Sequence, residues 1–114
     1  MNSFYRGDTF IFCFKLQDDN GKDINFEVND VVKFGMKKNI HTKEYSLYKE
    51  IDVKEETSEI KIEFSPEETQ PLNITSYLIE LELTREGYTN TIFQQEILIK
   101  GDVVRNVPED NSSS

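Results

Sequence analysis

Apolar and polar residues alternate along most of this chain. From Thr9 to Gln17 every second residue is apolar, so that Phe10, Phe12, Phe14 and Leu16 share one face. A period of two is typical of a β-strand with one buried face. Similar patterns predict further strands over residues 24–28, 28–39, 44–53, 58–64, 76–85 and 88–104. This reading places Cys13 at an inner or near-inner strand position.

Three of the predicted strands carry irregular positions. In the stretch 44–53 we expect Tyr45, Leu47, Ile51 and Val53 on one face, and Lys49 within that face predicts a partly exposed or edge strand. Gly35 indicates a bulge or a close packing contact. In the last strand, Gln95 interrupts the face that Phe93, Ile97 and Ile99 could share.

Turn signals separate the strands. Residues 18–22 read Asp-Asp-Asn-Gly-Lys, in which Asn20-Gly21 takes positive φ at low cost. Ser65, Pro66 and Glu68 fit a helix N-cap, first helical residue and capping box. We expect one short helical turn there, crossing between two sheets, and a second reversal at Glu86-Gly87.

About seven short strands with one helical turn predict an all-β protein, an antiparallel β-sandwich. The 114 residues leave room for one domain. We expect the domain to cover residues 1–107 and the polar residues 108–114 to form a flexible C-terminal tail.

The charge narrows the classes of partner. With 22 acidic against 13 basic residues the formal net charge is −9, which argues against nucleic acids and anionic membrane surfaces. No segment approaches the roughly 20 apolar residues of a membrane span. The single cysteine excludes a disulfide within the chain and gives no indication of secretion. We expect a protein made in the cytoplasm, with no membrane insertion.

Three motifs could indicate a binding site, but for each of them we prefer a structural interpretation. Arg6-Gly7-Asp8 matches an adhesion tripeptide, but its place before a strand predicts that Gly7 supplies a bend and Asp8 a turn bond. The acids around Asp18 could suggest calcium, but the positions where an EF-hand needs Gly and Glu hold Asp23 and Asn29. A zinc site or a Cys-His pair would require His41 to meet Cys13 in space, and a solvated loop histidine is preferred.

Two further groups of residues concern the surface. Glu80 and Glu82 project from the face of their strand opposite to Ile79 and Leu81, as acids on any solvated sheet face do, and no aromatic platform can be inferred beside them. Tyrosines outside the predicted core could form a patch for a sugar or a protein, or could each cover an edge of the sandwich, namely Tyr5, Tyr45, Tyr48 and Tyr88. No catalytic, cofactor-binding or metal-binding residue is assigned, no cofactor is expected, and the chain is not expected to be an enzyme.

Several stretches match a known pattern: "FYRGDTFIFCFKLQDDNGKDIN", "VVKFGMKKN", "EIKIEFSPEETQPL", "SYLIELELTREGYTNT" and "EILIKGDVV". Across residues 4–104 the sequence resembles the immunoglobulin-like domains of tailed-phage virion proteins, particularly the N-terminal domain of phage baseplate upper proteins. Tyr77, which opens a strand after the crossing turn, resembles the tyrosine corner of immunoglobulin-like domains. In that family the domain anchors receptor-binding machinery to the phage tail tip.

The resemblance implies a non-enzymatic structural module of a phage or prophage particle, located in the virion tail and made in the bacterial host cytoplasm. Its expected partners are other tail or baseplate proteins or itself, which allows a homo-oligomer. The alternative is a module that binds carbohydrate or adheres to the host surface through its tyrosines.

Overall fold

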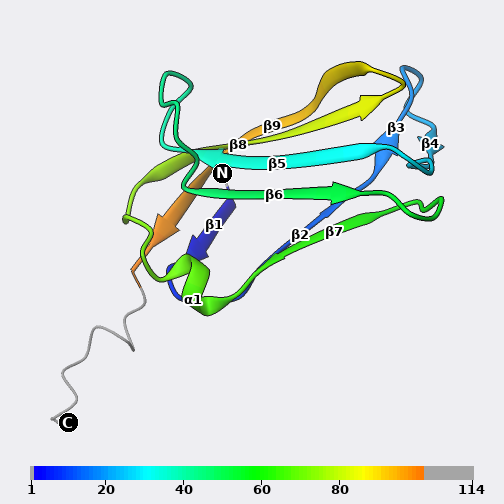
Figure 1. Cartoon of the computed structure of the whole chain (residues 1–114). Coiled ribbons are helices and arrows are strands. Elements are labelled where there is room, and N and C mark those ends of the chain that lie inside the picture. Colours follow the sequence, from blue (N-terminus) through cyan, green and yellow to red (C-terminus); the bar gives the residue numbers. More distant parts are fainter. Residues whose placement is uncertain (1, 102–114) are drawn as a thin grey trace, which may run out of the picture.

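The computed structural model describes residues 2–101, of which more than half lie in β-strands and four in one short helix (Figure 1). The expected boundary at residue 107 and the expected tail, 108–114, lie outside the described residues. The elements in chain order are β1 (Asn2–Tyr5), β2 (Phe10–Phe14), β3 (Leu16–Gln17), β4 (Asp23–Ile24), β5 (Val31–Lys37), β6 (Leu47–Asp52), β7 (Ile60–Phe64), α1 (Pro66–Thr69), β8 (Ser76–Arg85) and β9 (Tyr88–Lys100). The all-β prediction is therefore confirmed.

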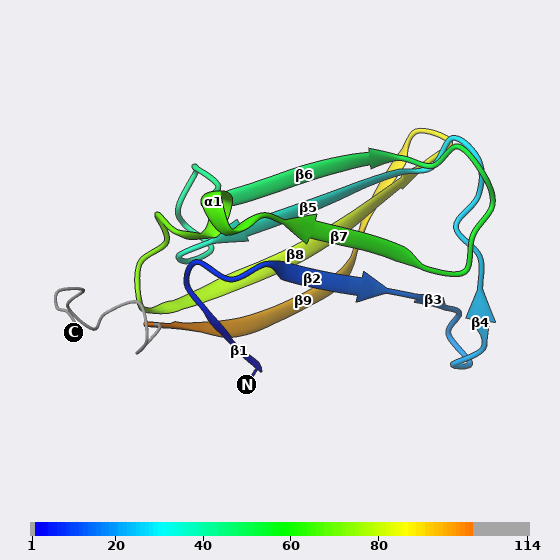
Figure 2. The same ribbon diagram turned by 90° about the horizontal axis from the view of Figure 1, so that it is seen from below.

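The strands form one large sheet and two small ones. The large sheet has the order β1-β9-β8-β5-β6, and β2 pairs with β7 in a separate antiparallel ladder. β3 and β4 make a small hairpin, so the single strand predicted over residues 9–17 is divided at Lys15. Figure 2 shows β2 and β7 lying across the large sheet, so that the molecule has two layers.

The expectation of purely antiparallel pairing is wrong at β1, which pairs with β9 in parallel. The cause is the turn that follows β1. The Asp8 N–H donates to the Tyr5 carbonyl at 3.1 Å, and Gly7 has φ of 86°. This turn sends the chain into the other layer as β2, so β1 remains beside β9, where the Arg6 N–H donates to the Lys100 carbonyl at 2.9 Å.

Aromatic rings join the two layers. The ring of Phe34 on β5 lies 4.8 Å from that of Phe12 on β2 and 5.5 Å from that of Phe64 on β7, measured between centroids. The inner faces predicted from alternation are confirmed for β2, β7 and β8, where the following residues are buried: Phe10, Phe12, Phe14, Ile60, Ile62, Phe64, Tyr77, Ile79 and Leu81. Local periodicity thus predicted which side chains fill the core.

Two residues lie on the face opposite to the predicted one. Cys13 is exposed, because Phe12 and Phe14 on either side of it point inward and alternation sends the thiol out. Tyr45 is exposed although Leu47 is buried, because Tyr45 precedes β6 and does not continue its alternation. The edge position predicted for this strand is confirmed, since β6 ends the large sheet.

The predicted capping box is present at α1, which connects the two layers as expected. The Ser65 hydroxyl accepts from the Glu68 N–H, and the Glu68 carboxylate accepts from the Ser65 N–H at 2.8 Å. Thr69, at the end of this helix, is fully buried. Its hydroxyl accepts from the Gly7 N–H at 3.0 Å and donates to the Asp8 carbonyl at 2.7 Å, so it fastens the turn after β1 to α1.

A side-chain hydrogen bond and a tight turn fix the two ends of β8. At its start the buried Tyr77 hydroxyl accepts from the Asn73 N–H at 2.9 Å, the bond expected of a tyrosine corner. At its end Glu86 and Gly87 have φ of 52° and 83°, which makes the predicted two-residue reversal into β9. The β8–β9 pairing then shifts by one residue at Ile92, a β-bulge.

A partly buried ion pair closes the end of the large sheet where β5 begins. Asp30 is 1% exposed and binds Arg85 through two contacts, from Nε at 2.9 Å and from an Nη at 2.7 Å. Its second oxygen also accepts from the Glu27 N–H at 2.8 Å. The Arg85 hydrogen bond lowers the pKa of Asp30 below its usual range, despite the opposing effect of burial.

Candidate functional site

The outward face of the large sheet carries a hollow above Gly35. In the register of the sheet, Gly35 on β5 lies between Tyr48 on β6 and Glu80 on β8. Because glycine has no side chain, space remains between the phenol ring and the carboxylate. The ring of Tyr45 fills part of it, and it lies so close that a Cβ at position 35 would overlap its Cε1 and Cδ1 atoms. The close packing contact predicted at Gly35 is thus confirmed.

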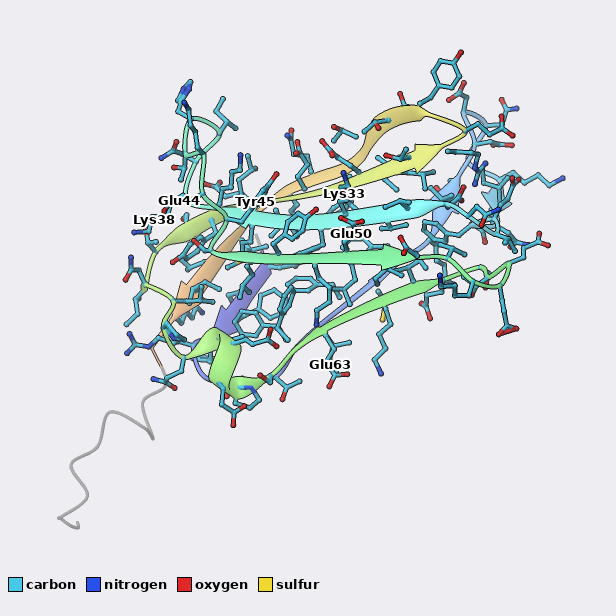
Figure 3. The ribbon with its side chains drawn as sticks, viewed as in Figure 1. Lys33, Lys38, Glu44, Tyr45, Glu50 and Glu63 are labelled. Carbon is cyan, nitrogen blue, oxygen red and sulfur yellow. The ribbon has the colours of Figure 1, made fainter. Side chains whose placement is uncertain are left out.

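A second row of side chains runs beside the first. Lys33 on β5 lies between Glu50 on β6 and Glu82 on β8. Figure 3 shows Tyr45, Lys33 and Glu50 along this face of the sheet. The two rows enclose a groove of about 290 Å³, which we call the tyrosine groove, lined by Lys33, Gly35, Tyr45, Tyr48, Glu80 and Glu82.

The two tyrosines form one wall of this groove. Their ring centroids are 4.9 Å apart with an interplanar angle of 42°, and the Lys37 ammonium lies 4.7 Å from the centroid of Tyr45. The Tyr48 hydroxyl lies 3.3 Å from the Glu50 carboxylate, to which it donates. Burial, and then the negative charge of Glu50, raise the pKa of Tyr48, so its phenol remains a protonated donor at neutral pH.

The opposite wall consists of carboxylates. Glu80 and Glu82 share a face as predicted, and Glu80 also accepts from the Gln94 side-chain amide at 2.9 Å. An aromatic wall facing carboxylates offers stacking on one side and hydrogen-bond acceptors on the other. The groove can therefore hold a small polar molecule that has an apolar face.

The sequence predicts that the residues of both walls of the tyrosine groove point outward, but it does not predict that the two walls lie side by side. Alternation predicts that Glu80 and Glu82 point outward, and it also leaves Tyr48 outside the core. The relation between them depends on the register of β5 with its two neighbours, which local patterns do not contain. The one available signal was Gly35, a residue without a side chain in an otherwise regular strand.

A second surface lies along the outer edge of β2. Within residues 2–101, β2 pairs only with β7. Its other edge has no hydrogen-bonded strand there, and Phe4 of β1 and Phe93 of β9 lie next to it. A groove of about 200 Å³, which we call the β2 groove, follows this edge and is lined by Asn2, Phe4, Ile11, Phe12, Cys13, Phe14, Ile79, Phe93, Gln95 and Ile97. None of these lining residues is charged.

The remaining candidates have structural roles. Gly7 bends the chain, and the Asp8 N–H makes a turn bond, as expected for the Arg-Gly-Asp stretch. The Asp18 carboxylate accepts from the N–H groups of Asn20 and Lys22, both at 2.9 Å, so it stabilises the predicted turn. His41 lies in the exposed loop between β5 and β6.

Of the two alternatives for the tyrosines, a patch forms only between Tyr45 and Tyr48, whereas Tyr5 lies on β1 and Tyr88 at the β8–β9 reversal. Among residues 2–101 no group of three or more His, Cys, Asp or Glu side chains is placed to hold a metal ion. The four-residue α1 is the only helix in this part of the chain, and it is far too short to cross a bilayer.

Comparisons with known proteins gave no match to a family model, to a curated protein or to a solved structure.

Proposed function

We propose that the chain is a non-enzymatic structural module of a phage or prophage particle, a tail or baseplate component that works by binding other proteins. Its place would be the virion tail, after synthesis in the cytoplasm of the bacterial host. The domain would be an immunoglobulin-like β-sandwich, with β1 as a departure from purely antiparallel pairing. The two layers, the crossing helix α1 and the Tyr77 hydrogen bond to Asn73 support that assignment.

The proposed assembly function is supported mainly by one observation. Within the described part of the chain, β2 has an edge without a hydrogen-bonded strand, and the groove along that edge is lined by uncharged residues. Exposed strand edges offer unpaired N–H and C=O groups to another chain. The chain is otherwise strongly charged, with 31% of its residues Asp, Glu, Lys or Arg. The lining of the β2 groove contains no charged side chain, so contact with another protein is more favourable there than contact with water.

The test is quantitative mass spectrometry of purified particles after prophage induction in the source cells. Recovery of the chain at a fixed stoichiometry with tail proteins is the expected result. Its absence from intact particles, while it remains soluble in the lysate, would overturn the proposal.

The tyrosine groove favours a second candidate function, carbohydrate binding or host-surface adhesion. Tyr45 and Tyr48 are 47% and 43% exposed, enough to stack against the apolar face of a sugar while Glu80 accepts from its hydroxyls. Because three carboxylates, Glu50, Glu80 and Glu82, outnumber the two lysines here, Lys33 and Lys37, a neutral sugar fits better than a sulfated or carboxylated one.

Binding to an array of neutral and anionic glycans tests this function. Tyr45→Ala should abolish binding of any neutral glycan that the wild type retains. Tyr88→Ala removes a 76% exposed tyrosine away from the groove and serves as the control. Equal loss in both variants, or binding only to anionic glycans, would contradict a sugar site in the tyrosine groove.

A further inference from the structure

We propose that the tyrosine groove binds an arginine side chain presented by a partner protein. The proposal rests on the assembly function above and adds to it a second contact surface, on the outward face of the large sheet. Three features of this face support an arginine: its net charge, the arrangement of a ring and carboxylates across Gly35, and a glutamate that makes no hydrogen bond within residues 2–101.

The outward face around the groove carries an excess of negative charge. We count the residues that the register places on this face of β6, β5 and β8 and of residues 94–98 of β9. Five are acidic and two are lysines, which gives a net charge of −3, namely Glu50, Asp52, Glu80, Glu82 and Glu96 against Lys33 and Lys37. Such a face attracts a cationic group before contact is made, whereas a neutral sugar gains nothing from it.

The walls of the groove suit a planar cation. In the register of the sheet, Gly35 lies between Tyr48 on one side and Glu80 on the other, and a volume of about 290 Å³ remains open there. A guanidinium can lay its flat face against an aromatic ring while the N–H groups along its edge donate to carboxylates. An ammonium has no flat face, and a sugar has no charge. The groove therefore matches arginine better than lysine or a sugar.

The aromatic wall already attracts a cation of the chain itself. The Lys37 ammonium lies 4.7 Å from the centroid of the Tyr45 ring. Aromatic rings attract cations through their electron-rich faces, and arginine makes such contacts more often than lysine. In the described part of the chain no cation lies over Tyr48, which is 43% exposed. The Tyr48 ring is thus the stacking surface that remains for an arginine.

Glu82 supplies the carboxylate. Glu50 accepts from the Tyr48 hydroxyl, and Glu80 accepts from the Gln94 side-chain amide. Glu82 lines the groove, yet among residues 2–101 it accepts no hydrogen bond and forms no ion pair. A carboxylate has about four lone-pair sites for hydrogen bonds. Glu82 is therefore the acceptor with the most capacity left for a guanidinium, and Glu80 lies two residues away on the same face of β8.

The first experiment is an NMR titration of the nitrogen-15-labelled chain with N-acetyl-arginine methylamide, up to about 50 mM, since one side chain binds at best in the millimolar range. We expect saturable shifts of the backbone amides of Gly35, Tyr48 and Glu82. The matched control ligand is N-acetyl-citrulline methylamide, which keeps the aliphatic stem and the planar head but carries no charge. It should bind at least about tenfold more weakly, because a charged donor binds a carboxylate more strongly than a neutral one.

The second experiment locates the site with two protein variants. Glu82→Gln keeps the size of the side chain and removes its charge, so the Kd for the arginine compound should rise at least about fivefold. Glu63→Gln makes the same change on β7, in the other layer and away from Lys33 and Glu50 (Figure 3), and should keep Kd within about twofold. Both variants have the same net charge, and circular dichroism verifies their folding.

The absence of shifts with the arginine compound at the highest concentration would overturn the proposal. Equal affinity for the citrulline compound would overturn the role of charge, and equal effects of the two variants would overturn the site. Shifts of the same amides with methyl glucoside, without any from the arginine compound, would replace the arginine by a sugar. None of these results bears on recovery of the chain in particles, which tests the assembly function separately.

Discussion

The ring of Tyr45 lies directly on the backbone of Gly35, in the space that a side chain at position 35 would occupy. Gly35 is a middle residue of β5, paired on both sides, where glycine weakens a strand. Its presence there is explained by the ring above it, since no other residue leaves the room that Tyr45 takes. The tyrosine groove thus depends on a residue that has no side chain.

A double-mutant cycle on these two residues measures that dependence. Gly35→Ala should destabilise the wild type by about 1 kcal/mol, because the tyrosine must leave its position. In a Tyr45→Ala background the same change should be neutral or stabilising by about 0.5 kcal/mol, because alanine suits a strand better than glycine. Urea denaturation of the four proteins gives the coupling free energy. Equal effects of Gly35→Ala in both backgrounds would show that the ring does not rest on the glycine.

The sequence-based predictions were accurate for features that depend on residues close together in the sequence, and they failed for features that depend on distant residues. Alternation identified Phe12 and Ile62 as core residues because period two is a property of neighbouring residues. The capping box at Ser65 and the turn at Glu86-Gly87 are equally local and were equally predictable. The inner position predicted for Cys13 was wrong because it ignored this alternation. Phe12 and Phe14 point inward, so the residue between them points outward.

The features that were missed depend on distant partners. The parallel pairing of β1 with β9 joins residues about a hundred positions apart, and no short pattern encodes it. Tyr45 meets Gly35 through the β5–β6 loop, whose path decides the face on which the ring lies. The tyrosine groove is formed by three strands in a particular register. The tyrosines and the glutamates could each be placed outside the core from the sequence, but their proximity could not be predicted.

Thr69 offers a test of the contact between α1 and the turn after β1. Thr69→Val keeps the shape but removes the hydroxyl, which leaves the Gly7 N–H and the Asp8 carbonyl without this partner. We expect a loss of about 1–3 kcal/mol in the free energy of unfolding. The Gly7 amide should also exchange faster with solvent, as followed by NMR.

The matched control for this contact is Thr69→Ser, which keeps the hydroxyl and loses one buried methyl group. It should cost about 1 kcal/mol through packing alone, and the Gly7 amide should remain protected. Faster exchange at Gly7 in the serine variant as well would mean that the protection does not come from the hydroxyl.

Tyr77 tests the bond that supports the immunoglobulin-like assignment. Tyr77→Phe removes the hydroxyl that accepts from the Asn73 N–H while it keeps the buried ring. The expected loss is about 1 kcal/mol, measured by urea denaturation, with faster amide exchange at Asn73. Tyr88→Phe, at an exposed position, should change neither quantity. A Tyr77→Phe variant as stable as the wild type would remove this bond from the support for the fold assignment.

The ion pair between Asp30 and Arg85 makes stability depend on pH. Asp30→Asn removes the buried charge that receives both arginine contacts, and it should lower the free energy of unfolding at pH 7 by about 2–3 kcal/mol. Asp52→Asn is the control, since that aspartate is exposed at the end of β6 and its replacement should change stability by less than about 0.5 kcal/mol.

The direction of the pH effect follows from the lowered pKa of Asp30 in the folded protein. A carboxyl with a lowered pKa stabilises the fold fully above its unfolded pKa of about 3.9, and the stabilisation is lost as the pH falls through the folded pKa. The stability difference between the wild type and Asp30→Asn should therefore stay constant from pH 8 to 6 and shrink below about pH 4. Denaturation curves of both proteins across this range measure it. A difference that persists unchanged to pH 2 would mean that the carboxylate charge contributes nothing and that the asparagine acts through packing.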